Sequence, residues 1–83
     1  MKKAVALRYP EDADAPYITA IAKGWNVERL LQIARENNVP IVQDEAVANL
    51  LSIQHVGDLI PEETYEVLAK IFAFIAKMEH DRQ

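Results

Sequence analysis

Cysteine is absent from the sequence, and the residue types that most often carry catalysis are scarce. The 83 residues include no Cys, one Ser, two Thr and two His. Without cysteine there can be no disulfide, no thiolate nucleophile and no cysteine–zinc site. His55 falls in a predicted loop. His80 lies between Glu79 and Asp81, but consecutive residues do not share a face of a helix, and a metal site would need them to. Because no nucleophile stands beside a matching base, we expect a protein that is not an enzyme and that binds no metal or cofactor.

Glycine and positive charge are also in short supply. Gly24 and Gly57 stand far apart, whereas a phosphate-binding loop needs several glycines together. We expect both glycines in turns with unusual backbone angles. Nine Lys and Arg against thirteen Asp and Glu give a net charge of −4. The basic residues are scattered, and this argues against nucleic-acid binding.

Long apolar runs are missing as well. None approaches the roughly 20 residues of a membrane-spanning helix. Met1-Lys2-Lys3 is followed by only a four-residue apolar run before Arg8, which does not match a signal peptide. Together with the lack of cysteine, these features predict a cytoplasmic protein.

What is present predicts a single α/β domain over residues 1–83. The composition is 51% hydrophobic and 27% charged, as in ordinary soluble proteins. Strands are expected at residues 4–9 and 17–22, on either side of an acidic loop. Residues 39–42 are expected to form a third strand after a helix. One parallel crossover would then complete a small mixed sheet of about three strands.

Three helices or more are expected to pack on this sheet. Apolar residues spaced i, i+3, i+4 and i+7 predict a helix that starts from an Asn26 cap and ends at Asn37-Asn38, where the left-handed conformation suits asparagine. Asp44 is expected to cap a short helix that ends near Ser52. The last helix is expected over residues 61–79, because Pro61 fits a first helical position.

The last predicted helix is more apolar than one buried stripe requires. Its main stripe spans about 120° at roughly 100° per residue and consists of Val67, Leu68, Ile71, Phe74, Ile75 and Met78. A further arc of about 100° on one side contains Tyr65, Ala69, Phe72 and Ala76. Either another part of the fold covers this arc, since most apolar residues belong to a core, or the arc is an exposed surface for a partner. In the second case Ala69 and Ala76 would leave a shallow groove with Tyr65 and Phe72 as its walls.

Several segments, taken in order, resemble one known family. They are AVALRY, AP, AKG, IARENNVPIV and VGDLIPEETYEVLAKIFAFI, and they cover the chain from Ala4 to about Ile75. In order and spacing they resemble the C-terminal cytoplasmic domain of the FlhB/YscU family, the export-switch proteins of flagellar and injectisome type III secretion. The resemblance implies the small α/β fold of that domain.

The resemblance also implies an incomplete sheet. Family members cleave themselves within an Asn-Pro-Thr-His motif just ahead of the strand that matches Ala4–Tyr9, and the strand upstream of the cut joins the same sheet. This sequence has Met1-Lys2-Lys3 at that place and no Asn-Pro pair. We therefore expect no self-cleavage, and a chain that resembles the downstream fragment encoded alone.

A binding patch is the third implication of the resemblance. The family's domain receives export substrates through a small apolar patch, whose positions match Ala15, Pro16, Ala69 and Phe72 here. Tyr65 and Ala76 flank these positions on the last helix.

The expected function is a non-enzymatic binding module whose partners are export substrates or export-gate proteins. It would be peripheral to the membrane-embedded apparatus. A homodimer that uses the same surplus apolar surface and the open edge of the sheet, with no role in export, is the alternative.

Overall fold

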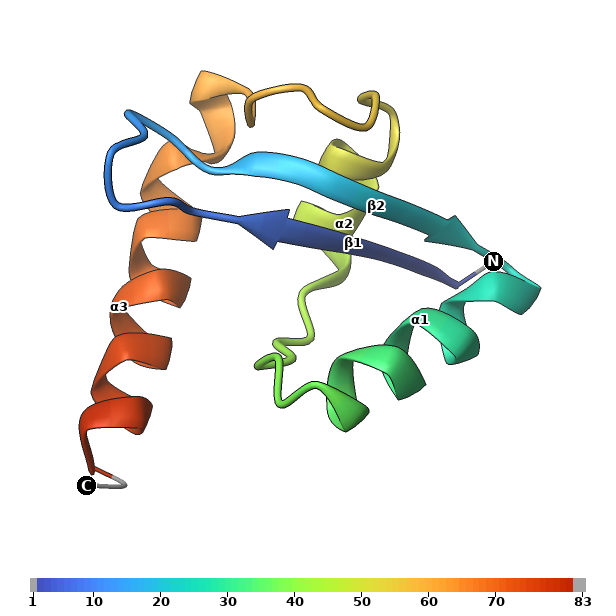
Figure 1. The fold of residues 1–83 in the computed structure, drawn as a ribbon. Helices are drawn as coiled ribbons and strands as arrows, with labels where there is room; N and C mark the ends of the chain where they lie inside the picture. The colour runs from blue at the N-terminus through green and yellow to red at the C-terminus, as the bar shows by residue number, and fades with distance from the viewer. Residues whose placement is uncertain (1, 82–83) are drawn as a thin grey trace.

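The fold is a two-stranded antiparallel sheet with helices packed around it (Figure 1), in a computed structural model that describes residues 2–81. The elements follow in the order β1 (Lys3–Arg8), β2 (Tyr17–Lys23), α1 (Trp25–Glu36), α2 (Glu45–Ser52), the 3-10 helix η1 (Glu62–Thr64) and α3 (Tyr65–Asp81). The predicted small α/β fold is confirmed. Within residues 2–81, none of the helices combines the length and the hydropathy that crossing a bilayer requires.

β1 and β2 run antiparallel and form a hairpin. Lys3 lies opposite Lys23 and Arg8 opposite Tyr17, with a register shift between Ala6 and Leu7. α2 packs mainly on β1, and α1 contacts both strands. The turn that joins the strands, residues 9–16, projects at one end of the sheet, and α3 passes beside that end (Figure 1).

The predicted third strand at residues 39–42 is wrong, and so is the parallel crossover that depended on it. This segment has no strand assignment, and its side chains Val39, Ile41 and Val42 are 42–49% exposed. β-branched residues favour strands because they pack well on a pleated, half-buried surface. A strand also needs a neighbour to bond with, which a local pattern cannot reveal.

The two edges of the sheet differ in their backbone partners. At the start of β2 the edge is covered by the loop before η1: the Ile18 N–H donates to the Asp58 carbonyl (2.9 Å), the Gly57 N–H to the Ile18 carbonyl (2.7 Å) and the Ile60 N–H to the Pro16 carbonyl (3.1 Å). Residues 2–81 supply no such partner to the far edge of β1. β1 is therefore an open edge, the kind of surface on which another strand can pair.

The helix boundaries follow the predicted signals at some ends and shift at others. Asn38 (φ 58°), Gly24 (φ 59°) and Gly57 (φ 95°) adopt positive φ as expected. α1 begins earlier than predicted, because its N-cap is Gly24 and not Asn26. The Gly24 N–H donates a hydrogen bond to the Lys2 carbonyl (2.9 Å). Before α3, the Thr64 hydroxyl donates to the Pro61 carbonyl (2.6 Å) and holds a separate 3-10 turn, so α3 itself starts only at residue 65.

The core joins the hairpin turn to α2, the loop before η1 and α3. Its buried cluster consists of Ala15, Val47, Leu51, Ile60 and Leu68. Val5, Leu7, Val67, Ile71 and Phe72 pack around this cluster as half-buried side chains. Because residues from both halves of the chain meet here, the cluster fixes α3 against the turn that follows β1.

Asp44 caps α2 as predicted, and its loss should weaken the fold measurably. Its side-chain oxygen accepts a hydrogen bond from the Val47 N–H at 3.1 Å. Asp44→Ala should lower the free energy of unfolding by about 1 kcal/mol, because a helix N–H loses its partner. Asp44→Asn keeps a capping oxygen, so it should lower the free energy of unfolding by only about a few tenths of a kcal/mol. Urea denaturation followed by circular dichroism measures both, and equal losses would contradict the capping role.

Candidate partner-binding groove

A hollow on the surface lies between the β1–β2 turn and the first turns of α3. It has a volume of about 170 Å³. Its lining consists of Tyr9, Asp14, Ala15, Pro16, Ile60, Tyr65, Leu68, Ala69 and Phe72. Small-molecule sites in proteins commonly enclose about 300–1,000 Å³. The hollow is smaller than such sites. We refer to it as the α3 groove.

Five of the six predicted contact residues line the α3 groove. Ala15 and Pro16 are buried and form its floor, while Tyr65 (44% exposed), the exposed Ala69 and the half-buried Phe72 come from α3. The two floor residues are about 50 positions away in sequence from the three residues on α3, so the two groups meet only through the fold.

Ala76, the sixth predicted contact, does not line the groove. It is exposed on α3, one turn beyond Phe72. Of the two alanines predicted to leave a shallow groove, Ala69 lines the hollow and Ala76 lies outside it. Phe72 also belongs partly to the core, so the surplus apolar arc is neither wholly covered nor wholly free.

Tyr9 forms one side of the α3 groove, and it was not among the predicted contact residues. Its ring meets Phe72 edge-on, with the centroids 5.5 Å apart and an angle of 71° between the planes. Such edge-to-face pairs contribute about 0.5–1.5 kcal/mol beyond burial. Tyr9 thus ties the end of β1 to α3 and closes one side of the groove. No local pattern predicts this contact, because Tyr9 was expected only as the last residue of a strand.

The floor of the groove is held rigidly. Pro16 fixes its own φ, and its carbonyl accepts the hydrogen bond from Ile60 described above. Ile60, 4% exposed, then lies against the floor from the adjacent loop. A rigid floor reduces the ordering cost when a partner binds.

The lining of the α3 groove is apolar apart from the Asp14 carboxylate and two tyrosine hydroxyls. Among the residues that the structure describes, no group of three or more His, Asp or Glu lies close enough to hold a metal ion. Burial of one apolar side chain in such a hollow stabilises a complex by about 1.5–3 kcal/mol.

Solved structures define the class of domain to which this fold belongs. The C-terminal domain of PscU superposes with a TM-score of 0.83 at 23% identity, over 88% of this chain and 95% of that one. A mutated EscU/SpaS C-terminal domain gives a TM-score of 0.80 at 22% identity, over 87% of this chain and 91% of that one. At these identities the likeness establishes the fold.

Sequence comparison establishes the family. The model of the FlhB HrpN YscU SpaS family matches residues 1–75. YlqH of Bacillus subtilis is 40% identical over 80 residues, which cover 95% of this chain and 86% of YlqH. The chain belongs to the FlhB HrpN YscU SpaS family, and the resemblance inferred from its motifs is confirmed.

The flagellar relatives are much longer than this chain. The flagellar biosynthetic protein FlhB of Helicobacter pylori is 35% identical over 81 residues, which make up 96% of this chain but 23% of that protein. FlhB of Bacillus subtilis is 37% identical over 76 residues, 89% of this chain and 21% of that protein. The similarity thus concerns one domain of these proteins.

Proposed function

We propose that this chain is a non-enzymatic binding module of the flagellar or a related type III export apparatus. The observation that carries the proposal is the α3 groove. Its floor and α3 wall are built from Ala15, Pro16, Ala69 and Phe72, the positions that match the substrate patch of the family. Export substrates or export-gate proteins would place an apolar side chain in this groove. The flagellar relatives support the export role.

The module would act as a separate equivalent of the downstream FlhB fragment, at the cytoplasmic side of the membrane-embedded apparatus. The similarity to YlqH over 86% of that protein supports a separate role. The open edge of β1 supports docking, because a strand of a longer FlhB could pair with it. The sequence has no Asn-Pro pair for self-cleavage.

A complementation experiment tests this role. A flagellated cell carries an FlhB that is truncated just before its downstream fragment, and this chain is supplied from a second gene. We expect swimming and export of flagellar subunits to return, because the chain docks on the truncated protein and restores the groove. Supplying the native downstream fragment is the positive control.

Failure to restore swimming by a folded, expressed chain would contradict the proposal. It would favour the homodimer, in which two β1 edges pair with each other. Sedimentation velocity at several concentrations detects that dimer directly.

A further inference from the structure

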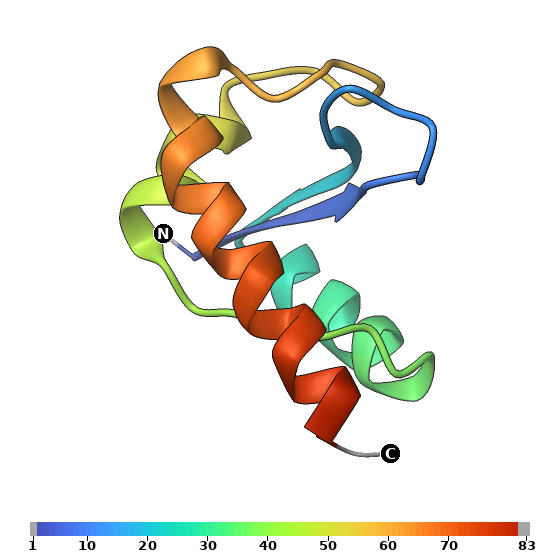
Figure 2. The same cartoon turned by 90° about the vertical axis from the view of Figure 1, so that its left-hand side faces the viewer.

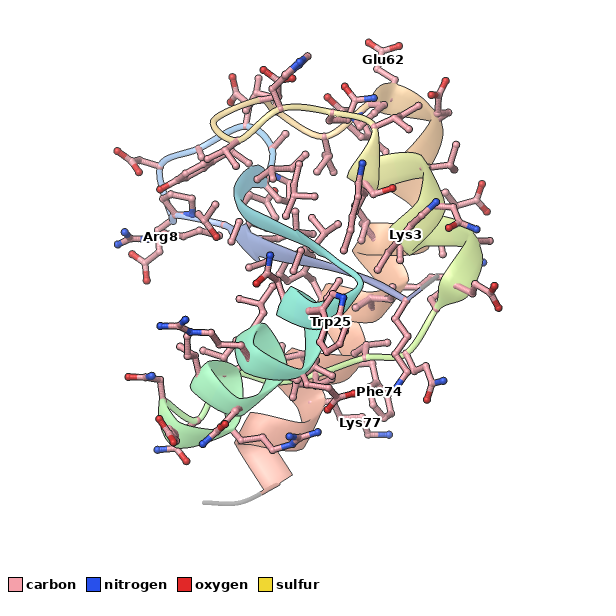
Figure 3. All side chains as sticks on the ribbon, turned by 90° about the vertical axis from the view of Figure 1, so that its right-hand side faces the viewer. Lys3, Arg8, Trp25, Glu62, Phe74 and Lys77 are labelled. Carbon is pink, nitrogen blue, oxygen red and sulfur yellow. The ribbon has the colours of Figure 1, made fainter. Side chains whose placement is uncertain are left out.

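The α3 groove lies at the acidic end of the molecule. Figure 2 shows the β1–β2 turn and the segment leading into α3 at the same end. Five carboxylates stand on these two segments: Glu11, Asp12, Asp14, Glu62 and Glu63. Glu62 projects outward from that end (Figure 3). The two segments that flank the apolar hollow therefore carry five carboxylates, of which Asp14 lies in its lining.

These carboxylates form no ion pair within the part of the chain whose side chains the structure describes. The ion pairs there are Lys2–Glu28, His55–Asp58 and Lys70–Glu66. None of them involves the five carboxylates around the groove. Their fields therefore add, and they attract cationic groups and repel anionic ones at the groove mouth.

Asp14 occupies a special place among the five. Of the nine residues that line the hollow, Asp14 is the one with a charged side chain, and it directly precedes the apolar floor of Ala15 and Pro16. Its carboxylate makes no side-chain hydrogen bond in the described residues, so it is available to a ligand. Asp14 is exposed, so an ion pair that it forms with a ligand is a surface pair and contributes up to about 1 kcal/mol, which is about fivefold in affinity.

We propose that the α3 groove selects peptide segments in which a lysine or arginine stands beside the apolar side chain that enters the hollow. Asp14 is the specificity-determining residue that pairs with this basic group. The inference rests on the proposed function, because it names the ligand class of the same groove. Acidic segments with the same apolar residue would be rejected by the carboxylates around the mouth.

Synthetic peptides test the selection. Each short peptide carries a single leucine in a neutral background, with lysine or glutamate placed in turn at each position on either side. Fluorescence polarisation with the intact chain measures the dissociation constants. At the best position we expect the lysine peptide to bind about fivefold more tightly than the glutamate peptide, as a partly exposed ion pair allows. High salt should shrink this difference.

Two variants assign the effect to Asp14. Asp14→Asn should remove most of the lysine preference, measured as the ratio of the dissociation constants of the lysine and glutamate peptides. Asp12→Asn removes the same charge from the same turn but lies outside the lining, so it should keep most of the preference. Circular dichroism confirms that both variants are folded.

Four results would overturn the inference, and they separate it from the proposed function. If leucine peptides bind regardless of charge, or if Asp14→Asn leaves the lysine preference intact, the groove stands and the selection is wrong. If the two variants lose the preference equally, the field of the whole turn, and not Asp14, is responsible. If no leucine peptide binds at all, the groove fails as a site and the selection fails with it.

Discussion

Ala69→Gln should reduce binding to the α3 groove by about tenfold to a hundredfold while leaving the fold intact. Ala69 is exposed on α3 and lines the hollow. A glutamine side chain there would fill much of the space that the partner's apolar side chain needs. Losing that burial costs about 1.5–3 kcal/mol, and each 1.4 kcal/mol is about a factor of ten in affinity. The leucine peptides and the complementation assay both measure the loss.

Ala73→Gln is the matched control for this prediction. Ala73 is also exposed on α3, but it does not line the hollow. Both substitutions place the same good helix former in the same helix without changing net charge. We expect Ala73→Gln to bind and to export like the unaltered chain. Equal binding by both variants at the unaltered level would show that partners dock elsewhere.

Leu51→Ala should remove a large part of the stability of the protein. Leu51 is 2% exposed and belongs to the core cluster that joins α2 to α3. Truncating a buried leucine costs about 2–5 kcal/mol, from lost burial and from the cavity that remains. A chain of this length has about 4–12 kcal/mol in total, at roughly 0.05–0.15 kcal/mol per residue. The unfolding midpoint in urea should therefore fall sharply.

Leu50→Ala provides the comparison within the same helix. Leu50 is 40% exposed and lies outside the core cluster. Its truncation should cost less than about 1 kcal/mol, as most surface substitutions do. Similar losses for the two variants would mean that α2 does not pack through the face that contains Leu51.

The local signals in the sequence predicted most of the elements but not their partners. The Asp44 cap, the positive φ of Asn38 and the two hairpin strands follow from residues that act on their nearest neighbours. Residues 39–42 carry the same kind of strand signal and form no strand. Whether an extended segment joins a sheet depends on an adjacent edge, and no local pattern contains that information.

The candidate site was predicted in part for the same reason. The helical wheel placed Ala69 and Phe72 on a surplus arc, and the resemblance added Ala15 and Pro16. Neither could show that Tyr9 pairs with Phe72, nor that Asp14 stands in the wall, because these contacts join the hairpin turn to a helix far along the chain. Ala76 is the same residue type as Ala69 and belongs to the same predicted arc, but it does not line the groove.

By itself the sequence determined the class of the domain, its family motifs, its acidic character and the residue types that it lacks. These properties depend on residue types and short spacings. The tertiary structure decided which apolar residues became core, which line the α3 groove, and which edge of the sheet stays open. Such outcomes depend on the packing of distant segments against one another, and burial is a property of the assembled fold and not of any single segment.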